Sequence, residues 1–347
     1  MNREIQSLTA LRGIAAMGVL AFHAGAPMPG YLCVDLFFML SGFVLMHAYG
    51  ERFATSVSGT GYRTFLRARL ARIYPVHLLT ILLLLPLYGH GPSFSGLALV
   101  HNLLLTQAPW YGASWNVGAW SISAEWHAYL IFPFLAVMIG ARSRIATIGI
   151  GFLCLGIVSV AVSVAGSANI AYTPAVFLRC LPEFIIGMVL YRLYRQDWLF
   201  PLLRRDRSFL AAAAAVAVLG CVKGTDTAIL WIFPILLIAA AANQSRGSRI
   251  LNSRPLRYLG KISYSLYMVQ MLSQFVFLEF LPNLNPIARA AALIALSFAM
   301  AIPISRFVEY PARDWLRAKR VGQPTRWIGI WQYLMPRRIA ESRRFSG

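Results

Sequence analysis

Residues 8–46, LTALRGIAAMGVLAFHAGAPMPGYLCVDLFFMLSGFVLM, decide the fold of this chain. Two apolar runs, each long enough to cross a lipid bilayer as a helix, flank the Pro- and Gly-containing turn 24–30. The runs carry Arg12, His23, Asp35 and His47 at positions where a helix that faces only lipid carries no ionisable side chain. The stretch therefore predicts two membrane-spanning helices that line a polar interior.

The spacing of Arg12 and His23 indicates where these two side chains point. The eleven steps from Arg12 to His23 correspond to about three helical turns plus ~20°, with a rise of ~16 Å. Both side chains therefore lie on one face, one near each end of the helix, as in a site that crosses much of the bilayer. The alternative is that each side chain extends to the nearer headgroup region, as Arg commonly does.

The composition places the chain among membrane proteins. Of its 347 residues, 58% are hydrophobic and only 13% charged, and the mean hydropathy is +0.62. The four cysteines lie singly in or beside apolar runs, and the six histidines are scattered, so neither a disulfide framework nor a metal site is expected. The predicted fold class is an all-α polytopic membrane protein with about ten transmembrane helices. The expected spans are 8–25, 31–50, 74–90, 117–140, 145–165, 175–194, 208–222, 227–242, 258–280 and 287–309.

The basic residues are distributed unevenly around these spans. All of the 32 Lys and Arg residues except Arg179, Lys223 and Arg289 fall in segments that this topology places on one side of the bilayer. Because cytoplasmic loops carry such an excess of Lys and Arg, both termini are expected in the cytoplasm. The same asymmetry accounts for most of the net charge of +20 without a soluble basic domain, so no nucleic-acid partner is expected.

Two further groups of residues near the first helices are candidates for a site. Asp35 opens the second helix, where its carboxylate either fixes the His23 imidazole or favours the helix N-terminus. Arg69 and Arg72 stand three positions apart ahead of Pro75, which is expected to begin the third span. Neighbouring guanidinium groups suit the capture of phosphates, although anchoring at the inner membrane surface also explains one or two arginines.

A polar stripe on the fourth span gives the second strong signal. Ser121, Glu125 and Tyr129 stand four positions apart and share a helix face. A carboxyl group two turns inside a membrane is a functional candidate unless it forms a structural ion pair. The available partner is Arg179, which has Glu183 four residues later as another choice, and the sequence leaves this pairing open.

Other segments add a third polar stripe and a region that does not span. Ser263, Tyr267 and Gln270 lie on one face of the ninth span. Residues 94–110 are apolar but too short for a full span between their Gly and Pro boundaries, so we expect a re-entrant or interfacial segment there. The predicted domains are a membrane domain over 1–317 and a basic cytoplasmic tail over 318–347.

Several ordered blocks resemble the membrane acyltransferase-3 family. Arg12 and His23 with ten residues between them are followed by VDLFFMLSGFVL, RARLARIYP, WSISAEWHAYLIFP, RCLPEFIIGMVLYR, LGKISYSLYMV and VEYP. The resemblance implies transfer of an acetyl or longer acyl group from acyl-coenzyme A to sugar-containing acceptors. Where this chain has Gln270, a histidine is common in the family. If that histidine transfers a proton in other members, Gln270 cannot do so here.

Together these features predict a membrane O-acyltransferase, with His23 as general base or acyl carrier and with Glu125 and Asp35 beside it. Arg12, Arg69 and Arg72 are expected to bind the acyl donor; Ser121, Tyr129, Arg179, Ser263, Tyr267 and Gln270 are expected to line the cavity or bind the acceptor. The expected partners are acyl-coenzyme A as co-substrate, a carbohydrate acceptor and the lipid bilayer of a bacterial inner membrane, with no permanently bound cofactor. The rival function is a proton-coupled transporter or flippase, because such carriers also hold ionisable groups inside the membrane.

Overall fold

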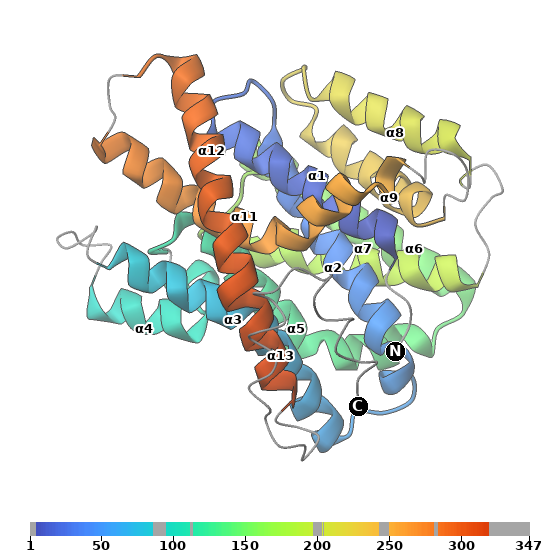
Figure 1. The fold of residues 1–347 in the computed structure, drawn as a ribbon. Coiled ribbons are helices and arrows are strands. Elements are labelled where there is room, and N and C mark those ends of the chain that lie inside the picture. Colours follow the sequence, from blue (N-terminus) through green and yellow to red (C-terminus); the bar gives the residue numbers. More distant parts are fainter. Residues whose placement is uncertain are drawn as a thin grey trace, which may run out of the picture.

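A computed structural model of the chain describes residues 5–85, 95–111, 114–196, 203, 205–242, 250–280 and 284–318. These residues form helices and connecting turns, with no strand among them (Figure 1). The helices are α1 (Gln6–His23), α2 (Cys33–Tyr49), α3 (Gly59–Leu84), α4 (Gly96–Leu104), α5 (Trp120–Gly140), α6 (Arg144–Ala165), α7 (Val176–Arg195), α8 (Asp206–Leu219), α9 (Asp226–Ala242), α11 (Arg254–Phe280), α12 (Pro286–Ile304) and α13 (Tyr310–Ala318).

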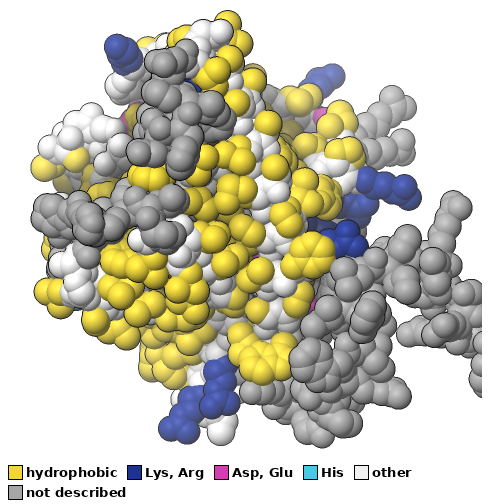
Figure 2. All heavy atoms as spheres, turned by 60° about the vertical axis from the view of Figure 1, so that its left-hand side comes forward, with side chains coloured by type: hydrophobic (Ala, Val, Ile, Leu, Met, Phe, Trp, Pro, Cys, Tyr) yellow, Lys and Arg dark blue, Asp and Glu magenta, His cyan; other side chains and the backbone are white. Residues whose placement is uncertain are grey.

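The all-helical fold class is confirmed, and a long helix covers most of each expected span. Four helical stretches among the described residues are both long and apolar enough to cross a membrane, namely Gly30–Tyr49, Val117–Gly140, Arg144–Ala165 and Pro286–Leu316. Side chains such as Leu82, Leu97 and Leu104 are exposed. Figure 2 shows a broad apolar face with Lys and Arg side chains at its margins, as expected of a protein surrounded by lipid.

The third span begins earlier than the sequence predicts. Pro75 lies inside α3 rather than at its start, so the Arg-rich segment from Gly59 onward is continuous with the apolar part of the helix. A proline is tolerated inside a membrane helix when neighbouring groups or local adjustments satisfy the freed backbone carbonyl. Close to Pro75, the Tyr264 hydroxyl of α11 also donates to the Ile73 carbonyl and ties the two helices together. Arg69 and Arg72 are thereby fixed on a rigid helix.

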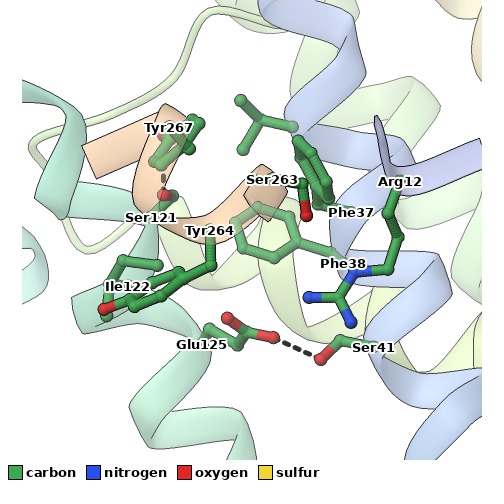
Figure 3. A pocket seen from close by; sticks show the side chains of 11 residues that line it. Arg12, Phe37, Phe38, Ser41, Ser121, Ile122, Glu125, Ser263, Tyr264 and Tyr267 are labelled. Atoms are coloured by element: carbon green, nitrogen blue, oxygen red, sulfur yellow. Dashed lines mark hydrogen bonds between the residues drawn. The ribbon is translucent and has the colours of Figure 1, made fainter. Parts of the chain in front are cut away.

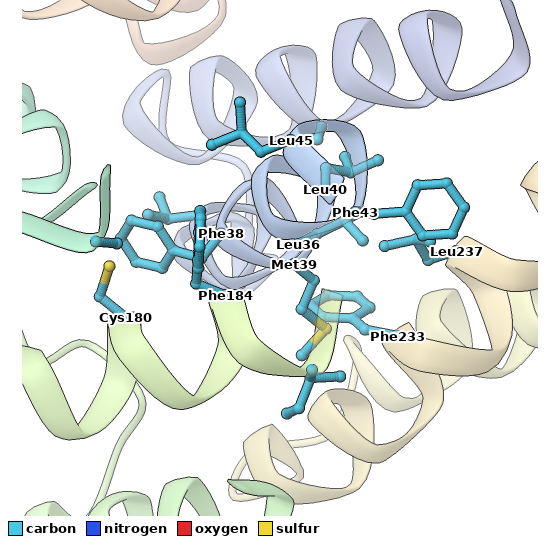
Figure 4. Close-up of a cluster of buried hydrophobic side chains, with 14 of the residues drawn as sticks. Leu36, Phe38, Met39, Leu40, Phe43, Leu45, Cys180, Phe184, Phe233 and Leu237 are labelled. Atoms are coloured by element: carbon cyan, nitrogen blue, oxygen red, sulfur yellow. The ribbon is translucent and has the colours of Figure 1, made fainter. Parts of the chain in front are cut away.

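Helix α2 lies at the centre of the helix packing and meets α7 at very close range (Figures 1 and 4). A Cβ atom added to Gly42 would lie 1.9 Å from the Phe184 carbonyl oxygen, and one added to Gly187 would lie 1.9 Å from that of Met39. Small residues let membrane helices approach in this way. Figure 4 shows the apolar side chains, among them Phe38 and Phe184, that pack around this contact.

Helices α1 and α11 pack through a second pair of glycines. A Cβ atom added to Gly260 would lie 1.8 Å from the Thr9 carbonyl oxygen, and one added to Gly13 would lie 2.6 Å from the Gly260 nitrogen. Further along, Ala16 and Leu20 of α1 share an apolar cluster with Leu266 and Val269 of α11. Helices α1 and α11 therefore run parallel to each other, and the polar stripe of α11 lies beside α1.

The segment predicted to be re-entrant forms a short helix and a π-helical turn. Helix α4 has 9 residues, a rise of ~14 Å, which is far less than the ~30 Å of a bilayer core. The turn Gln107–Tyr111 follows it, and Asn102 holds the region by accepting a hydrogen bond from the Trp115 backbone at 3.1 Å. Its position in the membrane stays a prediction. Of the predicted tail 318–347, only Ala318, the last residue of α13, is among the described residues.

Candidate active site

A narrow pocket of about 50 Å³ lies between α1, α2, α5 and α11. Figure 3 shows Arg12, Ser41 and Glu125 converging at one end of it, and Ser121 with Tyr267 at the other. Apolar rings close its sides, so the polar groups face one another in a space with little room for water. The lining residues are Arg12, Val34, Phe37, Phe38, Ser41, Ser121, Ile122, Glu125, Ser263, Tyr264 and Tyr267.

A wide cavity of about 750 Å³ begins where the narrow pocket ends. Arg12 and Ser41 line both spaces, so they mark the junction between them. The wide cavity is strongly basic, because most of its ionisable lining residues are cations. They are Arg12, Arg69, Arg72, Lys261, Arg306 and Arg313.

Glu125 faces this junction from the polar stripe of α5. The Ser41 hydroxyl donates a hydrogen bond to Glu125 Oε1, and the Tyr129 hydroxyl lies 3.3 Å from Ser41 Oγ. Four-residue spacing puts Ser121 and Glu125 on the wall of the narrow pocket and Tyr129 on the wall of the wide cavity. The stripe predicted from the sequence thus follows the polar interior from one space into the other.

Arg69 and Arg72 lie on the wall of the wide cavity and are held by different contacts. Arg69 Nη2 donates to the Tyr49 hydroxyl at 3.1 Å, and its guanidinium stacks over the Tyr49 ring with 5.1 Å between the guanidinium carbon and the ring centre. Arg72 Nη1 lies 3.8 Å from Glu309 Oε1. Glu309 also accepts a hydrogen bond from Ser265 at 2.6 Å. Glu309 on the π-helical turn Ser305–Glu309 thus forms an ion pair with Arg72 of α3.

Asp35 and Arg179 form a buried ion pair that the sequence did not predict. Arg179 Nε donates to Asp35 Oδ1, and Nη2 to Oδ2, both at 2.6 Å. Arg179 also donates to the carbonyls of Tyr31 and Ile170, and its guanidinium lies 5.1 Å from the Trp120 ring centre. The planar guanidinium matches a carboxylate in two parallel hydrogen bonds, so Asp35 and Arg179 satisfy each other fully.

This pair answers two questions that the sequence left open. The ion pair of Asp35 is with Arg179 rather than with His23, and Arg179 pairs with Asp35 rather than with Glu125 or Glu183. Closeness in sequence favoured His23 for Asp35 and Glu183 for Arg179, but the glycine contact between α2 and α7 brings Asp35 beside Arg179 instead. Arg179 lines neither space, so its contacts are structural. The two carboxyl oxygens of Glu183 have no hydrogen-bond partner among the described residues.

His23 is the last residue of α1 and is half-buried, with its ring 5.2 Å from the ring of Phe22. It lines neither the narrow pocket nor the wide cavity. The Cys33 sulfur lies 2.6 Å from where a Cβ of Gly18 would be, and Val34, next to Cys33, lines the narrow pocket. His23 is five residues beyond Gly18, a rise of ~7–8 Å along α1 from the level of Cys33.

The far end of the narrow pocket has its own hydrogen bonds. The Ser121 and Tyr267 hydroxyls lie 2.8 Å apart, and both also reach the Gly118 carbonyl. Ser263 donates to the Gly260 carbonyl at 2.9 Å. On the loop behind them, burial raises the pKa of the Tyr172 phenol, which donates to the Val117 carbonyl at 2.7 Å. Gln270, one turn beyond Tyr267, is buried and lines neither space.

Sequence reasoning missed part of this lining. Ser41 was not expected to face the site, yet it donates a hydrogen bond to Glu125 and marks the junction of the two spaces. Nothing in its sequence context signals this role. Lys261, Arg306 and Arg313 also line the wide cavity without having been singled out. For Lys261, a basic residue at the start of the polar stripe of α11 is a usable signal.

Comparisons with known proteins show the family of this chain. The acyltransferase-3 family, described as an acyltransferase domain, matches residues 5–306. The acyltransferase MdmB of Streptomyces mycarofaciens is 31% identical, over 78% of this chain and 79% of its own length. Protein 2 in the picA locus of Rhizobium radiobacter is 33% identical, over 46% of this chain and 93% of its own.

A more distant relative is the O-acetyltransferase OatA of Staphylococcus aureus, which is 24% identical over 99% of this chain and 64% of its own length. No solved structure matches the chain. The family match covers most of the sequence and includes the helices that bring together Arg12, Ser41 and Glu125. The chain therefore belongs to the acyltransferase-3 family of acyl-transferring membrane enzymes.

Proposed function

We propose that this enzyme moves an acyl group, normally acetyl, from acyl-coenzyme A in the wide cavity to a hydroxyl of a sugar-containing acceptor. The observation that carries the proposal is the junction at Arg12 and Ser41, where a basic cavity meets a narrow pocket that contains Glu125. A donor that fits must be anionic and bulky at one end and thin at the reactive end.

Coenzyme A has this shape. Its phosphates lie at the nucleotide end, and its thioester lies at the end of a long thin arm. A volume of about 750 Å³ is in the range of ligand sites in proteins, and guanidinium groups bind phosphate oxygens through paired hydrogen bonds. In this proposal Arg69 and Arg72 bind the phosphates, and the arm passes Arg12 into the narrow pocket.

The reaction needs a base near the acceptor hydroxyl. The hydroxyl oxygen attacks the thioester carbonyl, the new C–O bond replaces the C–S bond, the base takes the hydroxyl proton and coenzyme A leaves as a thiol. Sequence reasoning assigns the base, or a transient acyl carrier, to His23. The pocket geometry offers Glu125 as the competing candidate because Glu125 lines the pocket, whereas His23 does not. A variant of each residue distinguishes them, as described in the Discussion.

The relatives support the acceptor class. OatA is named an O-acetyltransferase and MdmB an acyltransferase, and hydroxyl acylation fits the polar wall formed by Ser121 and Tyr267. A sugar-containing acceptor is proposed from the resemblance to the family.

The proposed topology has ten spans with both termini in the cytoplasm of a bacterial inner membrane, and with residues 95–111 not crossing. It rests on the one-sided placement of Lys and Arg, and it opens the wide cavity to cytoplasmic acyl-coenzyme A. Single cysteines near residues 27, 168 and 225 should react with an impermeant reagent added outside intact cells, and those near 60 and 250 should not. Protection of residue 168 would contradict the ten-span arrangement.

The activity itself is tested with the purified full chain in lipid. Acetyl-coenzyme A labelled in the acetyl group should release coenzyme A thiol and transfer label to methyl glycosides or surface glycans in equal amounts. A proton-coupled transporter would move a sugar or anion into vesicles without releasing thiol. Absence of thiol release and of label transfer, in a protein that binds no acetyl-coenzyme A, would reject the donor assignment.

A further inference from the structure

Gln270 is a buried polar side chain whose amide makes no hydrogen bond with the part of the chain that the structure describes. It is 1% exposed, and neither Nε2 nor Oε1 of its amide has a hydrogen-bond partner among the described residues. Burying an amide without a partner costs about 1–3 kcal/mol in proteins, so it is rare without a functional reason. Hydrophobic residues of similar size would fill the same space on α11 without this cost.

Gln270 lies along α11 between the level of the narrow pocket and the level of His23. It follows Tyr267 by three residues, so it lies one turn further along α11 and ~60° around the helix from a pocket-lining residue. The register of α1 on α11 follows from the close approach of Gly13 to Gly260 and from the apolar cluster that contains Ala16 and Leu20 of α1 with Leu266 and Val269 of α11. In this register Gln270 lies level with about residue 21 of α1, within one turn of His23.

We propose that the Gln270 amide binds the reacting acyl group, with Nε2 donating a hydrogen bond to the carbonyl oxygen of the thioester. This inference rests on the proposed function and adds a catalytic residue to it. As the acceptor hydroxyl attacks, the carbonyl oxygen becomes an oxyanion; an N–H group placed beside it stabilises that charge more than it stabilises the bound thioester. When the C–S bond breaks, the C=O bond re-forms and the amide is left unchanged, so no proton moves through Gln270.

An amide suits this position for a physical reason. It presents the same N–H donors without charge at every pH, whereas the charge and the tautomer of an imidazole change near neutral pH. In this proposal a titratable residue removes the proton of the acceptor hydroxyl, and Gln270 donates a hydrogen bond to the carbonyl oxygen. The unsatisfied amide of the resting protein is the cost of keeping this donor in place.

The test compares Gln270→Met, which keeps the length of the side chain but removes the donor, with Gln270→His, which keeps an N–H. With acetyl-coenzyme A and methyl glycosides, Gln270→Met should lower kcat by about 10²–10³-fold, as loss of one oxyanion donor does elsewhere, while KM for acetyl-coenzyme A changes little. Gln270→His should retain more activity than Gln270→Met. The melting temperature of Gln270→Met should not fall, because an unsatisfied buried group is removed.

Ser297→Ala is the matched control. Ser297 on α12 is also buried with no partner for its hydroxyl among the described residues, and its replacement should leave kcat unchanged. A parental kcat for Gln270→Met would overturn the inference, as would a fall in melting temperature together with activity, which would indicate a structural role. If Gln270→Met is poorly expressed, Gln270→Leu serves the same comparison. A parent chain without any acetyl-coenzyme A turnover would instead reject the proposed function.

Discussion

Two arginines inside the helical domain, Arg12 and Arg179, have opposite surroundings. Arg179 is 1% exposed and uses its guanidinium on the carboxylate of Asp35, two backbone carbonyls and the ring of Trp120. Arg12 is half-buried, makes no hydrogen bond or ion pair with any described residue, and lies at the junction of two open spaces. Arg179 is therefore committed to the fold, whereas Arg12 is available to a ligand.

The comparison shows what makes a buried charge functional. A guanidinium inside a membrane must have its charge compensated, because the desolvation cost is large. For Arg179 the compensating charge is the carboxylate of Asp35, which is part of the fold. For Arg12 it comes from the nearby Glu125 carboxylate across the narrow pocket and, in our proposal, from the anionic donor (Figure 3).

The largest effect is expected from breaking the Arg179 pair. Arg179→Ala leaves Asp35 buried without a partner, which should destabilise the fold by about 3–5 kcal/mol. Thermal unfolding in detergent measures this loss, and all activity should be lost with the fold. The double variant Arg179→Met with Asp35→Leu removes both charges and should recover most of the stability. A stable Arg179→Ala protein would show that the pair is not structural.

The next effect concerns the base. His23→Gln keeps size and hydrogen bonding but removes the titratable nitrogen, so transfer should fall by about 10²–10⁴-fold if His23 is the base. Glu125→Gln makes the same change in the narrow pocket. Acetyl transfer and acetyl-coenzyme A binding are measured for both in parallel. Near-parental transfer by His23→Gln with loss in Glu125→Gln would move the base to Glu125, and activity in both would exclude both residues.

Replacement of Arg12 should weaken ligand binding without lowering the stability of the fold. Arg12→Ala should weaken acetyl-coenzyme A binding by about 10–100-fold, corresponding to loss of a charged hydrogen bond worth about 1.5–3 kcal/mol. Its melting temperature should stay close to that of the parent, in contrast to Arg179→Ala. Calorimetric titration with coenzyme A gives the affinity. If Arg12→Ala unfolded as readily as Arg179→Ala, the distinction between the two arginines would be wrong.

The smallest effect is expected at Ser41. Ser41→Ala removes the hydroxyl that donates to Glu125, a neutral-to-charged hydrogen bond worth about 1.5–3 kcal/mol at most and less where the carboxylate finds water. The protein should fold normally, and kcat should fall modestly. An unchanged rate would show that Ser41 only fills space.

Much of this protein follows from its sequence. The long apolar runs determine an all-helical membrane fold, and four-residue spacing determines that Ser121, Glu125 and Tyr129 share a face. These properties are local, because they depend on hydrophobicity and helical period within one segment. The one-sided distribution of Lys and Arg likewise predicts an orientation without any tertiary information.

Only the tertiary structure decided which charges meet. Asp35 had a nearer candidate in His23, and Arg179 had Glu183 one turn away, yet the close glycine contact between α2 and α7 joins Asp35 to Arg179. The same packing places Ser41 beside Glu125. Partner choice inside a membrane depends on distances between helices that are far apart in the chain. Those distances are set by small residues whose effect is steric, so no periodicity or spacing within one helix reveals them.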